Sequence, residues 1–513
     1  MNKIKNYFIP SGISDQYINQ ILTKHFGLEP LQIHKLFSYY TYILKKVSNG
    51  SCDIEEYIPV HHEIQKYFFE QKRKNGKYLL DLFLKLGLIE RLDYNPYTGE
   101  YCPGGYYNYS NNGNPHQSLS YRIPKQLFQS GKLYRMVPVG KKYLKKYVKQ
   151  LNRMNFTDLT KCEEYYRKAV AKVMDEIYIE DCLDVRMILA DMYSERATEL
   201  GGITFISQEE WVDAKISNFN LNPFSDGLVD AFGERLHHSV VRRKKVFRPY
   251  HRHPDFPNEK YEIIDIVNSQ PWFYANLNES LIEKFAPKCS DAIAIIKKYR
   301  RTSDYKRFKE LADEGKMYEA IYELWEKKYG SPIKQRDVND TETSYSEKLR
   351  KAAKEVTYIA FYANYTIEEN SKSTIQDFEQ LLLDYALEEG EDILEAMDKT
   401  REVLICKKAI QLLKDEFNTV YQMFKEIKQL NWKHLLPQEK EKKYARYKNT
   451  ALLVQRIEAG VIYTQIVKDL HNAGINKVIT YHDAVAVPES QYNQAKEIVI
   501  NSFLALELNP KLA

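Results

Sequence analysis

The segment KVITYHDAVAVPES, residues 477–490, places a bare His-Asp pair inside an otherwise apolar, strand-like run. Its β-branched and apolar residues favour a β-strand on each side of His482 and Asp483. A carboxylate buried among such residues is costly enough to shift its pKa or to demand a partner. We therefore interpret the segment as strand, His-Asp, strand, with Asp483 as a candidate functional residue.

A second carboxylate follows a β-branched run in EIIDIVNSQPWF, residues 262–273, where Asp265 is expected at a strand end. Two carboxylates on adjacent strands can hold two divalent ions about 4 Å apart, the geometry of in-line phosphoryl transfer. Mg²⁺ prefers such hard oxygen ligands and keeps water and substrate phosphates in its shell. Each aspartate taken alone is explained better as a strand-end cap or turn residue, so the case for a metal site depends on the motifs that accompany them.

Between these two acids lies LRKAAKEVTYIAFYANY, residues 349–365. Side chains four residues apart share one face of a helix. Here that face combines two cations with two aromatic residues, which are Arg350, Lys354, Tyr358 and Tyr362. The cations suit the phosphates of a nucleotide and the aromatic rings suit its base and sugar. The alternative is a surface helix with a basic flank and tyrosines packed on a neighbour.

The composition is that of an ordinary soluble globular protein of 513 residues, with 43% hydrophobic and 28% charged residues. No run approaches the roughly 20 apolar residues of a membrane span, and the N-terminus lacks the layout of a secretory signal, so a cytoplasmic protein without membrane partners is expected. The six cysteines lie far apart without a CxxC pair, which predicts reduced thiols.

The net charge of +5 is small for this length, so any nucleic-acid binding must come from local patches. Residues 238–253 (HSVVRRKKVFRPYHRH) and 297–309 (KKYRRTSDYKRFK) mix cations with aromatic residues, as phosphates and stacked bases require. Solvated helix faces explain the same composition equally well.

Helical periodicity runs through residues 14–90, and LIERL (88–92) and LSYRIP (119–124) then flank a long Gly, Asn and Tyr-rich stretch. This order predicts two antiparallel strands around a loop, and helices followed by such a hairpin resemble a winged helix with its wing at 93–118. Amphipathic helices are expected over 157–200, short apolar runs and turns over 205–277, and helices over 279–432 and 448–471. A strand, His-Asp, strand, helix unit is expected to close the chain.

The ordered motifs resemble those of single-subunit polymerases, meaning family A DNA polymerases and the phage-type and mitochondrial RNA polymerases. The helix face formed by Arg350, Lys354, Tyr358 and Tyr362, named here the 350–362 stripe, looks like their fingers-helix motif. The segment DIVNSQ with Asp265 looks like their first palm motif, and YHD (481–483) looks like their last palm motif. GERLHHS (233–239) is similar to their Gly-Arg-Leu segment, and LVQRIEAGVIYTQIVKDL (453–470) to the helix that leads into the last motif.

The resemblance covers roughly residues 160–513 and implies two-metal nucleotidyl transfer on primer-template DNA with nucleoside triphosphates. Asp265 and Asp483 would bind two Mg²⁺ ions (Mn²⁺ being an alternative). The roles implied for the other residues are as follows: γ-phosphate binding by Arg350, phosphate neutralisation and proton donation by Lys354, nucleotide packing by Tyr358 and Tyr362, and primer-template contacts by Arg235, Gln455 and His482.

Three positions depart from the family pattern. Gln270 stands where DNA polymerases carry a Glu that blocks the 2′-hydroxyl, and its size favours deoxynucleotides, although Pro271 follows it. Ala363 replaces the Gly expected after Tyr362, and Ala484 replaces an acid that the metal mechanism can do without. No exonuclease acid pair is found upstream, and the DTE at 340–342 is interpreted as a turn or helix cap.

The predicted fold is therefore α+β and mostly helical: a right-hand polymerase, with an antiparallel palm sheet and helical fingers and thumb, after a winged-helix-like domain. The expected division is 1–150 winged helix, 151–225 thumb, 226–278 palm, 279–445 fingers and 446–513 palm. A compact polymerase of this plan resembles enzymes of phages, plasmids and integrated elements.

Three alternatives remain open. An RNA polymerase or primase would share the palm and differ at the sugar gate. A DNA-binding replication initiator or regulator would keep an inactive palm and bind duplex through residues 20–125. A structural helical protein would hold the carboxylates of Asp265 and Asp483 more than about 8 Å apart.

Overall fold

The computed structural model describes most of the chain, including nearly all of the segments that carry the motifs. The described residues are 6–48, 57–60, 68, 79–92, 120–129, 134–144, 147, 165–199, 207–221, 228–338, 340–363, 365, 393–436 and 445–513, with some side chains inside helices and strands excepted. The chain folds into two compact units, which are described separately. Unit 1 comprises residues 1–163, 171–228 and 237–261, and unit 2 comprises residues 164–170, 229–236 and 262–513. The five-part division stays a prediction.

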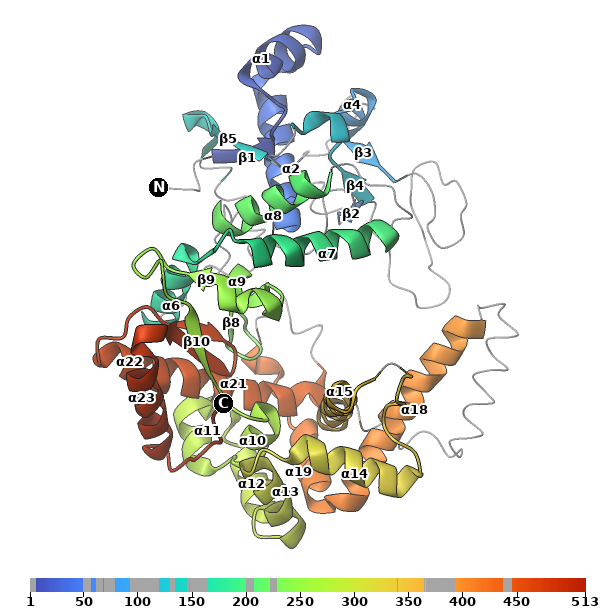
Figure 1. Cartoon of the computed structure of the whole chain (residues 1–513), viewed down its shortest axis with the longest axis vertical. Helices are drawn as coiled ribbons and strands as arrows, with labels where there is room; N and C mark the ends of the chain where they lie inside the picture. Colours follow the sequence, from blue (N-terminus) through green and yellow to red (C-terminus); the bar gives the residue numbers. More distant parts are fainter. Residues whose placement is uncertain are drawn as a thin grey trace. The chain divides into compact units, whose positions relative to one another are not determined.

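Unit 1 begins with a helical region packed on small antiparallel sheets (Figure 1). Strand β1 (Asn6–Pro10) pairs with β5 (Tyr134–Pro138), and α2 (Pro30–Ser48) packs against β1. The remaining elements of this region are α1 (Asp15–Tyr17), the π-helical turns Ile18–His25, β2 (Ile58–Pro59), α4 (Leu79–Lys85), β3 (Glu90–Arg91) and β4 (Ser120–Arg122). Their buried side chains form one aromatic-rich core.

The predicted strand pair in this region is confirmed. β3 and β4 are antiparallel, with Glu90 opposite Arg122, and β2 pairs with the other edge of β4. The winged-helix interpretation stays a prediction, because its wing, 93–118, lies outside the described residues.

Helices also dominate the rest of unit 1. The expected helices over 157–200 appear as α6 (Tyr165–Glu176) and α7 (Leu183–Glu199), of which α6 begins in unit 2. The prediction of only short runs and turns over 205–277 is wrong at α8 (Gln208–Leu221). Its apolar face is short, consisting of Trp211, Val212 and Ile216, so the periodic signal is weak.

Unit 2 combines a helical region with one three-stranded sheet. The sheet order is β10 (Tyr261–Asp265), β12 (Ala484–Pro488), β11 (Ile479–Tyr481), so β12 is central. The helices are α10 (Ser269–Ala275), α11 (Glu279–Phe285), α12 (Ala292–Tyr299), α13 (Ser303–Asp313), α14 (Met317–Tyr329), α15 (Glu342–Tyr362), α18 (Ile393–Glu416), α19 (Asn418–Gln429), α21 (Asn449–Gly460), α22 (Lys468–Asn472) and α23 (Tyr492–Leu504). Within the described residues, the helices predicted over 279–432 and 448–471 and the closing strand, turn, strand, helix unit are confirmed; residues 366–392 of the first range lie outside them.

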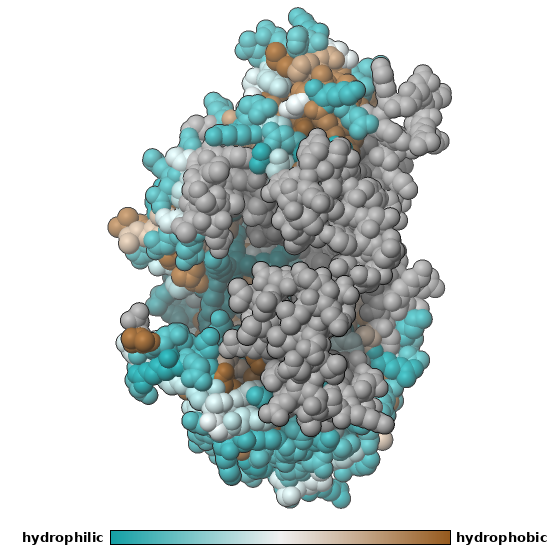
Figure 2. Space-filling view, turned by 90° about the vertical axis from the view of Figure 1, so that its right-hand side faces the viewer, coloured by the Kyte–Doolittle hydropathy of each residue, from teal (hydrophilic) through white to brown (hydrophobic). Residues whose placement is uncertain are grey.

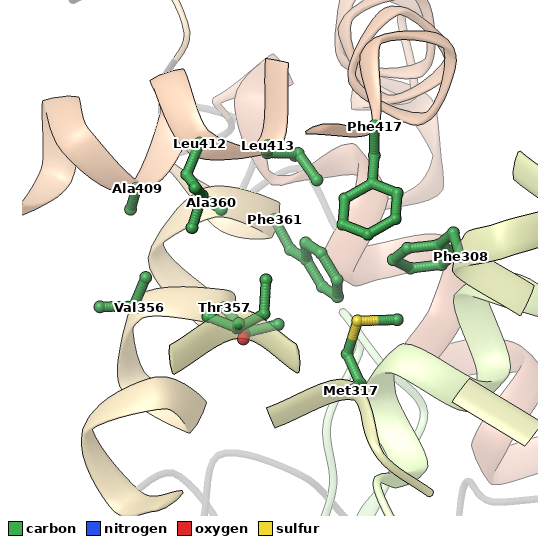
Figure 3. A pocket seen from close by; sticks show the side chains of 11 residues that line it. Phe308, Met317, Val356, Thr357, Ala360, Phe361, Ala409, Leu412, Leu413 and Phe417 are labelled. Atoms are coloured by element: carbon green, nitrogen blue, oxygen red, sulfur yellow. The ribbon is translucent and has the colours of Figure 1, made fainter. Parts of the chain in front are cut away.

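Aromatic side chains hold α15 in the core of unit 2, where it packs beside α14 and α18 (Figure 1). The Phe361 ring lies 5.0 Å from that of Tyr274, 5.2 Å from that of Phe424 and 5.9 Å from that of Phe308. On the α18 side of Phe361, an apolar pocket is lined by residues of α13, α14, α15 and α18 together with Phe417 (Figure 3). The hydroxyl of Thr357 is satisfied there by the carbonyl of Ala353 at 2.7 Å.

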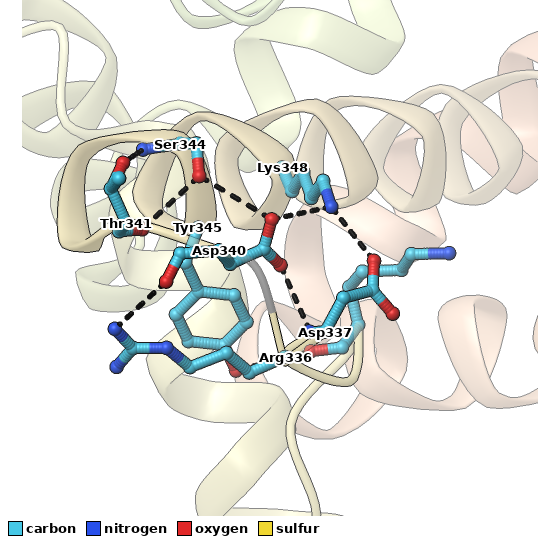
Figure 4. Close-up of polar contacts among 8 residues, drawn as sticks. Arg336, Asp337, Asp340, Thr341, Ser344, Tyr345 and Lys348 are labelled. Carbon is cyan, nitrogen blue, oxygen red and sulfur yellow. Dashed lines mark hydrogen bonds and ion pairs between the residues drawn. The ribbon is translucent and has the colours of Figure 1, made fainter.

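The start of α15 is fixed by a polar cap (Figure 4). Thr341 is the N-cap residue, and its hydroxyl accepts the backbone N–H of Ser344 at 3.1 Å. Asp340 accepts from Lys348 at 2.6 Å, one turn into the helix. The interpretation of residues 340–342 as a helix cap is therefore confirmed.

The end of α15 is held by a buried lysine. The Lys428 side-chain nitrogen donates to the carbonyl of Ala363, the C-cap residue, at 2.7 Å and lies 3.5 Å from the centre of the Tyr365 ring. Burial lowers the pKa of Lys428 to about 6, while Cys406 opposes the shift. One side chain of α19 thus fixes the turn that follows Tyr362.

Polar surface, helix length and free thiols can be stated for the part of the chain that the structure describes. On the face shown in Figure 2, the surface at the lower end is predominantly hydrophilic. Among the described helices, none has the length and apolar character needed to cross a membrane. Cys182, Cys289 and Cys406 are free thiols.

Replacing Lys428 by Met is expected to flatten part of the pH dependence of stability. Between pH 6 and 10.5 the unfolded chain carries a protonated amine at this position and the folded protein a neutral one. The unfolding free energy of the wild type should therefore rise with pH, relative to that of Lys428→Met, by up to about 1.4 kcal/mol per pH unit.

Denaturant unfolding of both proteins between pH 6.5 and 9 measures this difference. Lys327→Met, at an exposed position of α14, controls for the loss of one positive charge. Parallel pH profiles for the wild type and Lys428→Met would contradict a neutral buried amine.

Candidate active site

The His-Asp pair that interrupts the apolar run forms the turn of a β-hairpin. β11 and β12 are antiparallel, with Tyr481 opposite Ala484, so His482 and Asp483 are the two turn residues. His482 has φ of 61°, the positive value that two-residue hairpin turns require at their first position. Charge is tolerated here because the turn leaves both side chains only partly buried.

Asp265 lies on the strand next to this hairpin. It is the last residue of β10, which neighbours β12, and Asp483 directly precedes β12. The backbone N–H and C=O of Asp265 bond to Ala513 at 3.2 Å and 2.9 Å, which fixes the end of β10. The two acids predicted on adjacent strands therefore belong to one sheet.

The stripe of α15 forms as the spacing predicts. The Lys354 ammonium lies 5.6 Å from the centre of the Tyr358 ring, and the Tyr358 and Tyr362 rings are 5.9 Å apart. Arg350 is half-exposed, and its guanidinium donates to Glu319 at 2.8 Å and to Asn268 at 3.0 Å. Because Asn268 follows Asp265 by three residues, Arg350 joins the fingers-like helix to the end of β10.

The middle of the stripe is within electrostatic range of the hairpin turn. Burial raises the pKa of the Tyr358 hydroxyl, and the negative charges of Asp483 and Glu458 add to the rise. The positive charge of Arg235 opposes it. Tyr358, Asp483 and Arg235, which were selected from three separate segments of the sequence, are thus within electrostatic range of one another.

Gln270 is buried, and both ends of its amide are engaged. Its Nε2 donates to Oε2 of Glu458, and its Oε1 accepts from the hydroxyl of Tyr362. Gln270 is the second residue of α10. Asn268 directly precedes this helix, and its φ of 55° turns the chain from β10 into α10. The predicted sugar-gate residue is therefore held by a fixed hydrogen-bond network.

Glu458 at the centre of this network was not selected from the sequence. It is completely buried, and its Oε1 lies 2.7 Å from a guanidinium nitrogen of Arg235. Burial raises the pKa of its carboxyl to about 8, Arg235 opposes the rise and Asp483 adds to it. A signal was present, because Glu458 is a lone acid among apolar residues in RIEAGVIY, as Asp483 is in its own run.

The loop that presents Arg235 is built by its own acid and by α21. The Asp230 carboxylate accepts the backbone N–H of Phe232 at 2.9 Å, of Gly233 at 2.6 Å and of Arg235 at 3.2 Å. Arg456, which is buried, donates to the carbonyl of Phe232 at 2.9 Å. The GERL segment and the helix before the last motif are therefore packed together.

Gln455, the predicted primer-template contact on α21, lies against this loop. A Cβ atom added to Gly233 would come within 2.5 Å of Gln455 Oε1 and 2.8 Å of its Cβ. A glycine at 233 is therefore required by the close approach of the α21 side chain. Of these two α21 side chains, it is that of Glu458, not Gln455, that pairs with Arg235.

The two basic segments differ in how their charge is compensated. In 297–309, ion pairs join Lys297 to Glu279, Lys298 to Glu426, Arg307 to Glu416 and Lys309 to Asp313. Four of the seven cations of this segment therefore form ion pairs with acids, while Arg300, Arg301 and Lys306 are exposed. In 238–253, Arg242, Lys244 and Lys245 are exposed, while Arg252 pairs with Glu180.

The described residues offer a limited set of metal donors. No group of three or more His, Cys, Asp or Glu side chains within this part of the chain is arranged to hold a metal ion. Asp265 and Asp483, both partly buried, are the candidate donors that the sequence selected at this sheet. Hard carboxylate oxygens on neighbouring strands fit Mg²⁺ with water and phosphate completing the shell.

Comparisons with known proteins give little further support. No family model and no curated protein matches the chain. Among solved structures it is similar to the POL domain of Pol1 from M. smegmatis, in complex with DNA primer-template and dNTP, with a TM-score of 0.34 and 11% identity over 72% of each chain. These values do not establish a common fold.

Substituting Gly233 by Ala is expected to destabilise unit 2 by about 1–3 kcal/mol, because the new methyl group overlaps Gln455 and displaces the Arg235 loop. Thermal and denaturant unfolding measure the change. Gly140→Ala is the matched control, since its added Cβ meets Tyr143 at an ordinary 3.7 Å. Equal stability of Gly233→Ala and the wild type would show that the loop is not packed as described.

Proposed function

We propose that this chain is a template-dependent nucleotidyltransferase, namely a DNA-directed DNA polymerase without proofreading, built as a right hand. The proposal is carried by one observation: Arg235, Glu458, Gln270 and Tyr362 form a continuous network, and Asp483 lies within electrostatic range of it. Three of these residues were selected separately as polymerase-like motif positions. Their convergence in unit 2 supports a single site for nucleotide and primer-template.

Asp265 and Asp483 would hold two Mg²⁺ ions, which when bound supply Lewis-acid activation of the primer hydroxyl and neutralise triphosphate charge. The placement of both carboxylates beside β12, Asp265 at the end of the neighbouring β10 and Asp483 in the turn before β12, supports this role. Removal of either carboxylate should therefore cost more activity than removal of a phosphate contact.

The cationic end of the α15 stripe would bind the triphosphate. Lys354 is exposed and close to Tyr358, so its ammonium is available to neutralise phosphates and to donate a proton to departing pyrophosphate. Arg350 would contact the γ-phosphate, and its bonds to Asn268 and Glu319 keep its guanidinium near the end of β10. Tyr358 and Tyr362 would pack on the nucleotide.

Gln270 would select the sugar, and Arg235, Gln455 and His482 would contact the primer-template. A glutamine fixed by Glu458 and Tyr362 has the bulk to oppose a 2′-hydroxyl, which favours deoxynucleotides over ribonucleotides. RNA synthesis on the same palm is the alternative, and the choice of nucleotide distinguishes the two.

The Asp483→Asn variant tests the proposal directly. With a primed DNA template, Mg²⁺ and dNTPs, the wild type should extend the primer. Asp483→Asn should lose about a thousandfold or more in rate, because several kcal/mol of transition-state stabilisation disappear with the carboxylate. Single-nucleotide extension, resolved on a denaturing gel, measures both rates.

Glu416→Gln, which removes a surface ion pair with Arg307, is the matched control and should extend at the wild-type rate. Extension only with rNTPs would assign the chain to RNA synthesis. Tight DNA binding with no extension by the wild type would instead identify a binding protein with an inactive palm.

A further inference from the structure

Glu458 engages two site residues through its two carboxylate oxygens. Oε1 faces the Arg235 guanidinium at 2.7 Å, and Oε2 accepts from Gln270. The side chain has no exposed surface, so solvent supplies none of its hydrogen bonds. The Glu458 carboxyl group therefore links Arg235, which is proposed to contact the primer-template, to Gln270, which is proposed to select the sugar.

The orientation of the Gln270 amide depends on this connection. A neutral amide has a donor end and an acceptor end, and a 180° flip exchanges them. Here the donor end meets Glu458 and the acceptor end meets the Tyr362 hydroxyl. With the Glu458 carboxyl ionised, a flip would set Gln270 Oε1 against the carboxylate oxygen Oε2, and rotation of the side chain out of its pocket would leave buried polar groups without partners; both are unfavourable.

Tyr362 is itself held in place from the other side. It is the last residue of α15, and the following carbonyl, of Ala363, accepts from Lys428. Its ring also lies 6.2 Å from that of Tyr274. The acceptor end of Gln270 thus meets a fixed donor, and Glu458 is the group that holds the other end.

We propose that Glu458 is a positioning residue that fixes Gln270 and Arg235, and that discrimination between deoxynucleotides and ribonucleotides depends on it. This inference rests on the proposed function and extends it to a residue outside the polymerase-like motif positions. Because the Glu458 side chain has no exposed surface, it would act through the orientation of Gln270 and not by direct contact with a nucleotide.

The test compares wild type, Glu458→Met and Glu458→Gln for insertion of one dNTP and of the matching rNTP. Methionine fills a similar volume without an acceptor, so the ratio of kcat/KM for dNTP over rNTP should fall by about tenfold or more, the effect of about 1.4 kcal/mol. Glutamine retains one acceptor oxygen, so its ratio should lie between those of the wild type and Glu458→Met. A residue needed only for folding would lower both rates together and leave the ratio unchanged.

Two controls make the result decisive. Glu426→Gln removes another carboxylate with two partners, Lys298 and Tyr299, at a distance in sequence from the network, and should keep the wild-type ratio. Circular dichroism identifies the folded variants, and the glutamine variant decides the matter if Glu458→Met does not fold. An unchanged ratio in a folded Glu458 variant overturns this inference alone, whereas failure of the wild type to extend with either nucleotide overturns the proposed function and this inference with it.

Discussion

A carboxyl group without exposed surface must obtain all its hydrogen bonds from the protein, and this requirement organises the centre of unit 2. Glu458 is compensated by an ion pair with Arg235 on one side and by a hydrogen bond from Gln270 on the other. Because those partners come from segments more than 180 residues away in sequence, the buried acid ties the 230–235 loop and the end of β10 to α21. An uncompensated acid at this position would be strongly unfavourable, so these three segments are constrained to meet.

Helix α21 is the element through which this constraint acts. Gln455 leaves room only for a glycine at 233, Arg456 bonds to the carbonyl of Phe232, and Glu458 pairs with Arg235. The helix is buried over almost its whole length, including polar residues at its start. It therefore provides both apolar packing and the polar contacts that shape the loop.

Helix α15 is fixed at both ends, which determines where its stripe lies. Its first turn is capped by Thr341, with Asp340 bonded to Lys348, and its last carbonyls are approached by Lys428. Between these ends, aromatic packing around Phe361 sets the rotation of the helix. As a result the Tyr358 side chain lies within electrostatic range of Asp483, and the Tyr362 hydroxyl donates a hydrogen bond to Gln270.

The sequence by itself determined the local elements and most of the candidate residues. Alternating and helical periodicities predicted the closing hairpin, the strand pair formed by β3 and β4, the helix that carries Arg350 to Tyr362 and its cap at 340–342. These features depend on spacing within one segment, which a single sequence displays. Helix α8 was not predicted from the sequence, because its apolar face is short.

Only the tertiary structure decided which residues meet. Glu458, Arg456 and Lys428 lie on helices with many buried positions, where amphipathic spacing does not separate a functional charge from a structural one. Their roles depend on partners in distant segments, such as the carbonyls of Phe232 and Ala363, which carry no sequence signature. Backbone groups and long-range pairings are properties of the folded chain, and for that reason the network around Gln270 became visible only there.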